Sequence, residues 1–271
     1  MTLASCDSRK TAGENPFFTE WDTPHGVPPF DKILPEHFMP AFERGMSLHE
    51  AEIDAITSNK DEATFENTIL AYDDAGQMLA QTELVFGMLC AAETNDRMQA
   101  LQEQAMPLLA AHRDKIRLDD KLFVRVKEVY DRRAALGLDA EQMRLLQKTY
   151  DSFVRAGALL DAEQKARLKE INGQLSLTAV KFGNNILAEN NNFVLELKSD
   201  ELDGLPAGIR DAAREKARQM GKGDKWVFTL HKPSLIPLLT YSTKRDLREK
   251  IYKAYLNLSL IHISEPTRLR R

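Results

Sequence analysis

The chain has 271 residues and a formal net charge of −4 at pH 7, from 41 acidic and 37 basic side chains, so it lacks the strong positive charge of proteins that bind a nucleic-acid backbone. Its composition, 43% hydrophobic and 29% charged, is typical of a globular protein long enough for a sizeable core. No run of about 18 apolar residues could span a membrane, and Cys6 and Cys90 are too few for a disulfide framework.

Residues 1–14 resemble the start of a bacterial lipoprotein. Leu3-Ala-Ser-Cys6 matches a lipobox, in which a cysteine after small residues is lipidated. A working signal needs an apolar run of about 7–15 residues before it. We interpret Met1 as an internal methionine of a longer signal peptide, Cys6 as the lipidation site and the following residues as a polar tether. This predicts a lipid anchor in the cell envelope or periplasm; a chance match, and a cytoplasmic protein, is the alternative.

Residues 15–257 are predicted to form one helical lobe. Prolines and aromatic residues over 15–35 indicate an extended arm with aromatic anchors. Beyond it, apolar residues recur at steps of three and four, which predicts a bundle of helices. The expected helices cover residues 36–59, 64–93, 95–116 with a kink at Pro107, 119–136, 161–189, 201–220, 233–241 and 243–257, together with one that begins at Asp139.

Local signals refine this pattern. Asp139 and Asp161 each begin the sequence Asp-Ala-Glu-Gln, which predicts a capping box at the start of two helices, and Thr243 with Asp246 is a possible third. Residues 193–198 and 225–230 are rich in β-formers and predict two strands. The expected fold class is therefore all-α, with one small β element.

Residues 258–271 do not continue the preceding pattern. Leu258–Arg268 has the sequence Leu-Ser-Leu-Ile-His-Ile-Ser-Glu-Pro-Thr-Arg, which in one reading frame is the translation of a transposon-based sequencing adapter. We interpret residues 258–271 as an adapter-derived artefact and exclude them from the fold.

A search for catalytic patterns gives no active site. Zinc hydrolases commonly place two histidines four residues apart on one helix, with a glutamate after the first. His49-Glu50 is the one His-Glu pair, but Ile53 occupies the second ligand position. We therefore expect His49 to face solvent, and His112 and His231 to be single core or surface residues.

The sequence also lacks the patterns of other catalytic and binding sites. No Gly-x-Ser-x-Gly turn is present for a serine nucleophile. Gly221-Lys-Gly is too short to cradle a phosphate and predicts a turn before a strand. Cys90 lies in the apolar run Leu84–Ala92, which predicts a buried and unreactive thiol.

Several stretches between Asn15 and Asn257 nevertheless carry a family resemblance. The arm includes Trp21-Asp-Thr-Pro-His-Gly-Val-Pro-Pro-Phe-Asp-Lys-Ile, then Pro35-Glu-His-Phe-Met-Pro-Ala-Phe-Glu and Thr64-Phe-Glu-Asn-Thr-Ile. The most specific stretch is Pro233-Ser-Leu-Ile-Pro-Leu-Leu-Thr-Tyr-Ser with Arg245-Asp-Leu-Arg-Glu-Lys-Ile-Tyr-Lys-Ala-Tyr. Together they resemble the N-terminal half of bacterial peptidyl-dipeptidases (dipeptidyl carboxypeptidases) of the thimet oligopeptidase and oligopeptidase A family.

The resemblance implies a two-lobed helical zinc metallopeptidase with a channel for short, unstructured peptides. Its zinc site lies in the second half, where an H-E-x-x-H helix and a later glutamate bind the metal and the first glutamate activates the bound water. That motif is absent from these 271 residues, so no catalytic, cofactor-binding or metal residue is assigned to them. Residues 15–257 are expected to wall the channel.

Two functions stay open. The first is a truncated zinc peptidyl-dipeptidase, whose parent releases C-terminal dipeptides and which binds no zinc and is inactive alone. The second is a non-enzymatic helical module that binds a peptide or protein in a groove. The first predicts exposed apolar surface around Ile236–Leu239 and Ile251–Leu256, where the missing lobe would pack.

Overall fold

A computed structural model describes residues 15–258, which divide into two compact units, up to residue 177 and from residue 178 onward. The proposed lipidation site Cys6 and residues 259–271 of the adapter-like segment lie outside the described residues, so both remain predictions. The described part is mostly helical with one two-stranded sheet, which confirms the predicted fold class. Within it, no helix has the length and apolar character needed to cross a membrane.

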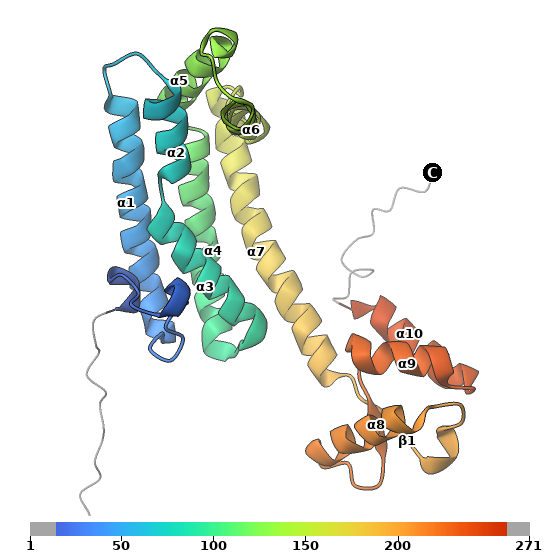
Figure 1. The fold of residues 1–271 in the computed structure, drawn as a ribbon. Coiled ribbons are helices and arrows are strands. Elements are labelled where there is room, and N and C mark those ends of the chain that lie inside the picture. The colour runs from blue at the N-terminus through green and yellow to red at the C-terminus, as the bar shows by residue number, and fades with distance from the viewer. Residues whose placement is uncertain (1–14, 259–271) are drawn as a thin grey trace, which may run out of the picture. The chain divides into compact units, whose positions relative to one another are not determined.

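The first unit is a helical bundle preceded by the proline-rich arm (Figure 1). The arm contains short 3-10 turns, and Phe17 anchors it in the core as expected. Helix α1 packs against both α3 and α4. The helices are α1 (Phe38–Ser58), a π-helical turn (Phe65–Leu70), α2 (Ala71–Asp74), α3 (Gln77–Ala92), α4 (Asp96–Arg117), α5 (Asp120–Asp131) and α6 (Ala140–Arg155), and α7 (Ala162–Asn192) begins in this unit.

The predicted capping boxes at the two Asp-Ala-Glu-Gln sequences are confirmed. At the start of α6, the Gln142 amide donates to Asp139 Oδ1 at 2.9 Å and the Asp139 amide donates to Gln142 Oε1 at 3.1 Å. At α7 the same pair of bonds joins Asp161 and Gln164 at 2.8 and 3.2 Å. Each box satisfies backbone donors that the first helical turn leaves free.

The prediction of one helix over residues 64–93 is wrong, because the helix breaks at Gly76. This glycine has φ +78°, a left-handed conformation that ends α2 and allows α3 to start in a new direction. A Cβ on Gly76 would lie 2.8 Å from His49 Nδ1, so the close approach of α1 also requires glycine. The Gly76 amide is held by a 2.7 Å hydrogen bond to Glu52 Oε2.

Helix α4 contains Pro107, in agreement with the prediction of one helix over residues 95–116. Other helix ends differ from the prediction. Helix α5 ends at Asp131 and not at residue 136. The helix expected from residue 201 begins at Ala207, because Gly204 and Pro206 come first. The possible box at Thr243 is absent, since the Thr243 hydroxyl donates to the Asp203 carbonyl instead.

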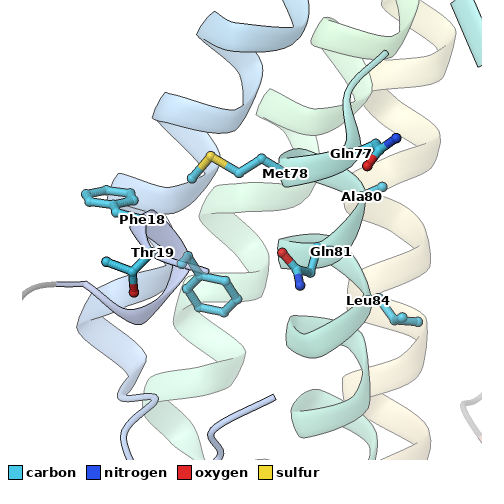
Figure 2. A pocket seen from close by; sticks show the side chains of 8 residues that line it. Phe18, Thr19, Gln77, Met78, Ala80, Gln81 and Leu84 are labelled. Carbon is cyan, nitrogen blue, oxygen red and sulfur yellow. The ribbon is translucent and has the colours of Figure 1, made fainter. Parts of the chain in front are cut away.

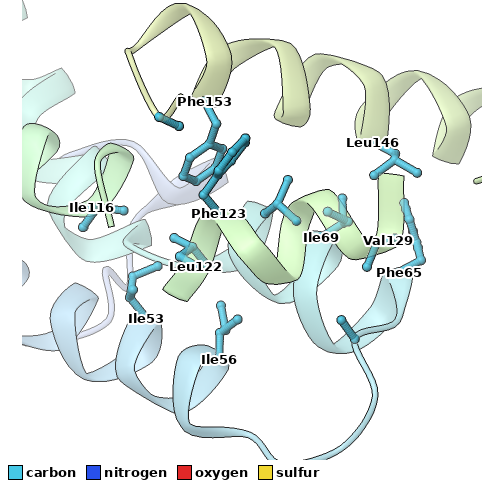
Figure 3. Packing of buried hydrophobic residues seen from close by; sticks show 13 residues of the cluster. Ile53, Ile56, Phe65, Ile69, Ile116, Leu122, Phe123, Val129, Leu146 and Phe153 are labelled. Carbon is cyan, nitrogen blue, oxygen red and sulfur yellow. The ribbon is translucent and has the colours of Figure 1, made fainter. Parts of the chain in front are cut away.

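Two apolar clusters form the core of the first unit. Figure 3 shows one of them, in which side chains from α1, the π-helical turn, α5 and α6 meet. Its aromatic centre is Phe153, which is fully buried, with its ring centroid 5.2 Å from that of Tyr72 and 6.1 Å from that of Phe123. The other cluster joins the arm to α1, α3 and α4 and includes Phe17, Phe38, Phe42 and Phe86.

The second unit combines the end of α7 with the predicted sheet. Strands β1 (Leu195–Leu197) and β2 (Trp226–Phe228) pair antiparallel, with Glu196 opposite Val227. Both fall within the predicted β segments, and Gly221–Gly223 lies in the turn before β2 as expected. The remaining helices are α8 (Ala207–Gln219), α9 (Lys232–Tyr241) and α10 (Arg245–Leu256).

The predicted exposed apolar surface is confirmed in part. Ile236, Tyr252 and Leu256 are about half exposed, whereas Leu238 and Ile251 are fully buried in the core of the second unit. The apolar residues that recur at steps of three and four along α7, here called its apolar stripe, are also largely exposed, with Leu175 at 59% and Phe182 at 42%. Their spacing predicts the helix correctly, but it does not predict that these side chains are buried.

The backbone conformation of Gly204 leads to a prediction about the stability of the second unit. Its φ is +84°, and a Cβ there would lie 2.1 Å from the carbonyl oxygen of Tyr241. We expect Gly204→Ala to lower the free energy of unfolding by at least about 1–3 kcal/mol from backbone strain alone. Gly208→Ala is the control, because nothing lies within 4 Å of its added Cβ and it sits in helix α8. This control is expected to stabilise by up to about 1 kcal/mol, and equal effects in urea unfolding would contradict the prediction.

Candidate functional site

A groove between the N-terminal arm and α3 is one of the pockets on the first unit. It has a volume of about 600 Å³, within the usual range for ligand sites, and is lined by Phe17, Phe18, Thr19, Gln77, Met78, Ala80, Gln81 and Leu84. None of these residues carries a charge. The arm is held against the bundle because Phe17 is buried in the core with residues of α1, α3 and α4. Within the arm, the indole nitrogen of Trp21 donates to the Pro16 carbonyl at 2.8 Å.

Figure 2 shows how the polar side chains of the groove are placed. Phe18 and Thr19 lie on the arm, and the Gln81 amide points from α3 toward it. The side chains of Thr19, Gln77 and Gln81 make no hydrogen bond within residues 15–258, so their donors and acceptors are available. The groove therefore combines apolar walls with uncharged hydrogen-bonding groups. Sequence reasoning missed it, because no motif links the arm to α3.

A second polar cluster joins α1 to α4. His112 Nε2 lies 3.1 Å from His49 Nδ1, and the two residues are 63 positions apart in the sequence. His112 Nδ1 lies 3.5 Å from Glu50 Oε1, and the other oxygen of Glu50 accepts from Lys115 at 2.8 Å. The cluster borders a pocket of about 390 Å³.

The expectations that His49 faces solvent and that His112 is a single residue without a partner are both wrong. His231, in contrast, is exposed at the start of α9.

Burial favours the neutral form of both histidines. Burial is the largest cause that lowers the pKa of His49. The neighbouring His112 lowers this pKa further, whereas Glu52 and Glu50 raise it. Burial also lowers the pKa of His112, with Lys115 adding to the effect and with Glu50 and Glu83 opposing it. The hydrogen bond to Lys115 is the largest cause that lowers the pKa of Glu50.

These shifts predict that the first unit is less stable in mild acid. The unfolded histidines titrate near about pH 6.5, and the folded ones at lower pH, so the unfolded state binds more protons below that value. The free energy of unfolding should be constant above about pH 6.5 and fall as the pH drops below it. Urea unfolding across this range measures the effect. His49→Gln should reduce the slope, and a slope equal to that of the unaltered chain would contradict the prediction.

Within the described part of the chain, no three or more His, Cys, Asp and Glu side chains are grouped so that they could hold a metal ion. Residues 15–258 therefore do not fit the zinc ion that the family resemblance implies. Cys90 was expected to be buried and is half-buried; burial raises the pKa of its thiol to about 11, which favours the protonated form.

Comparison with known proteins confirms the resemblance. The chain is 37% identical over 241 residues to dipeptidyl carboxypeptidase of Escherichia coli and 35% identical to that of Salmonella typhimurium. It is 26% identical over 234 residues to oligopeptidase A of Escherichia coli. The first match covers 89% of this chain but 35% of the relative, so the chain spans about a third of the length of the proteins it matches. No family model matches the chain.

Over most of its length, the chain is similar to proteins named dipeptidyl carboxypeptidase and oligopeptidase A. Its identity to the dipeptidyl carboxypeptidases is higher than its identity to oligopeptidase A or to a thimet-like oligopeptidase.

Proposed function

We propose that this chain is the N-terminal part of a zinc-dependent peptidyl-dipeptidase that acts on short, unstructured peptides. The observation that supports the proposal is 37% identity over 89% of the chain to a protein named dipeptidyl carboxypeptidase. The helical units would wall and position the substrate, and the zinc ligands and water-activating glutamate would come from the rest of the polypeptide. The chain should therefore bind peptides without cleaving them.

The test compares the 271-residue chain with the protein from its complete gene. Both are incubated with zinc and a quenched fluorescent peptide that carries a free C-terminus. We expect chelator-sensitive release of C-terminal dipeptides by the complete protein and none by the chain. Robust zinc-dependent turnover by the chain, or a complete gene without an H-E-x-x-H sequence, would refute the proposal; the latter would favour a non-enzymatic peptide-binding module.

We also propose that Cys6 carries a lipid that holds the mature protein in the cell envelope. The support is the lipobox-like Leu3–Cys6 sequence followed by a polar segment. Labelling of cells with a palmitate analogue should mark the complete protein, and Cys6→Ser should abolish the label while Cys90→Ser should not. Labelling that persists in Cys6→Ser would contradict this proposal.

A further inference from the structure

Helix α1 meets two other segments of the first unit at His49. Nδ1 of His49 lies 3.1 Å from Nε2 of His112 on α4, and His112 is only 5% exposed. The same nitrogen of His49 would lie 2.8 Å from a Cβ on Gly76, the glycine between α2 and α3. The Gly76 amide donates to Glu52, which lies one turn beyond His49 on α1. One histidine therefore contacts both α4 and the break between α2 and α3.

The carboxylate of Glu50 determines which ring nitrogens carry hydrogen. His112 Nδ1 is buried without a hydrogen bond among residues 15–258, and Glu50 Oε1 lies 3.5 Å from it. A negative oxygen at that distance favours a hydrogen on Nδ1 over a lone pair. A neutral imidazole has one hydrogen, so Nε2 of His112 is then an acceptor. The 3.1 Å contact is therefore a hydrogen bond that Nδ1 of His49 donates.

This pair of rings can take up one proton without losing its contact, but not two. The first proton can enter Nε2 of His49 while Nδ1 continues to donate. A second proton would place hydrogens on both of the facing nitrogens, so two positive rings would meet donor to donor. Burial, which lowers the pKa of both histidines, makes a charged pair still less favourable. The second proton must therefore separate the rings.

The surrounding charges indicate which contact changes next. Glu50 and Glu52 on α1 and Glu83 on α3 attract a positive pair, whereas Lys115 on α4 repels it. Glu52 is also the acceptor that holds the Gly76 amide, at 2.7 Å. Once the rings separate, a positive ring can draw this carboxylate away from the amide.

We propose that His49 and His112 form a pH-sensitive switch that loosens the junction of α1, α4 and the Gly76 break in acid, while the rest of the first unit stays folded. In the closed state the rings share a hydrogen bond and Glu52 holds the Gly76 amide. In the open state the rings are apart and Glu52 faces them. The inference does not depend on the proposed function, because every contact lies within the first unit and none involves a substrate.

Hydrogen exchange of the Gly76 amide in the 271-residue chain measures the opening. The protection factor is used, because it corrects for the pH dependence of exchange in an unfolded chain. We expect it to fall at least about tenfold between about pH 7.5 and about pH 5, since one pKa unit corresponds to a factor of ten. The Leu122 amide is the reference, because it also donates to a carboxylate, Asp119 Oδ1 at 2.8 Å. Its protection should stay constant, and equal losses at both amides would mean global unfolding and contradict the switch.

The variant His112→Gln separates the switch from titration of Glu52 alone. A glutamine oxygen can still accept from His49, but the side chain takes up no proton, so the Gly76 amide should stay protected in acid. A loss as large as that of the unaltered chain would overturn the proposal. The matched control is His231→Gln, at an exposed histidine of the second unit, which should lose protection at Gly76 as the unaltered chain does.

The ring nitrogens provide a readout that needs no variant. In an isotope-labelled chain, nitrogen chemical shifts distinguish a ring nitrogen that carries hydrogen from one that does not. We expect hydrogen on Nδ1 of both His49 and His112 at about pH 7.5, and proton uptake in two separate steps below about pH 6.5. Hydrogen on Nε2 of either neutral ring, or independent titration of the two rings in one step, would refute the switch.

Discussion

Replacing Phe153 by alanine is expected to lower the free energy of unfolding of the first unit by about 3–5 kcal/mol. The ring is fully buried between those of Tyr72 and Phe123, so its removal leaves a cavity in the close-packed core. The loss combines the apolar surface no longer removed from water with the contacts that the cavity leaves unmade. Urea unfolding followed by circular dichroism at neutral pH measures it.

The matched control is Phe30→Ala, which makes the same chemical change on the arm at a ring that is 40% exposed. It should cost far less, because much of the ring already contacts water in the folded state. Similar losses at the two positions would mean that Phe153 does not occupy the close-packed centre in which the structure places it.

Local signals predicted this protein best. The boxes at Asp139 and Asp161 and the two strands depend on residues within a few positions of one another, and all were confirmed. The break at Gly76 was missed because the apolar period runs on both sides of it, through Ile69 and Leu79. A glycine within such a pattern does not reveal that α1 approaches it closely.

Features that depend on distant residues could not be predicted. The contact of His49 with His112 joins two helices across 63 positions, and neither residue has a motif around it. The stripe of α7 was predicted to be apolar, but Leu175 is mostly exposed because a periodic pattern gives a face and not its partner. The groove likewise forms where the arm reaches α3. The proposed function rests on sequence similarity to known proteins and not on the spacing of catalytic residues. Residues 15–258 contain no group of three or more His, Cys, Asp and Glu side chains that could hold a metal ion.

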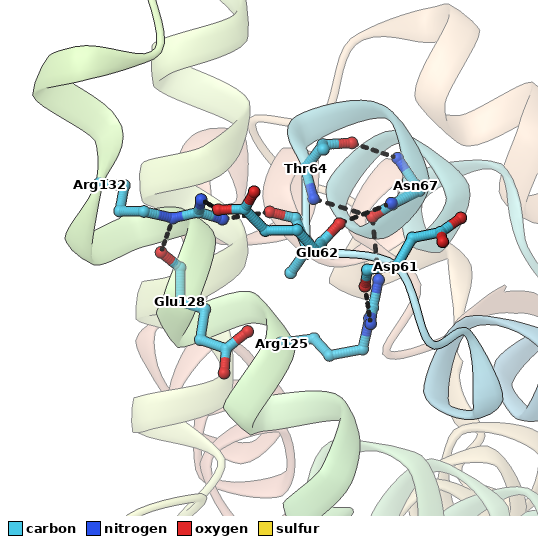
Figure 4. Close-up of polar contacts among 8 residues, drawn as sticks. Asp61, Glu62, Thr64, Asn67, Arg125, Glu128 and Arg132 are labelled. Carbon is cyan, nitrogen blue, oxygen red and sulfur yellow. Dashed lines mark hydrogen bonds and ion pairs between the residues drawn. The ribbon is translucent and has the colours of Figure 1, made fainter.

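The second large effect is expected at Arg125, a buried arginine of α5 that holds the loop between α1 and the π-helical turn (Figure 4). Its guanidinium donates to the carbonyls of Asn59 and Asp61 at 3.0 and 3.2 Å and to Asn67 Oδ1 at 3.0 Å. Among residues 15–258, no carboxylate forms an ion pair with it, so the charge is stabilised by two loop carbonyls and the side-chain oxygen of Asn67. Arg125→Met would keep the apolar stem and remove every donor.

We expect Arg125→Met to lower the free energy of unfolding by about 2–4 kcal/mol, since hydrogen bonds to a charged group contribute about 1.5–3 kcal/mol each and the loop can recover part by hydration. Arg144→Met, at an exposed position of α6, should change stability by less than about 0.5 kcal/mol.

Hydrogen exchange gives a second readout, because the backbone amides of Asp61, Thr64 and Asn67 each donate a hydrogen bond within this loop. They should exchange faster in Arg125→Met even under conditions where both variants remain folded. Unchanged exchange at these three amides would mean that the loop holds its shape without the guanidinium, and the stability loss would then belong to α5 alone.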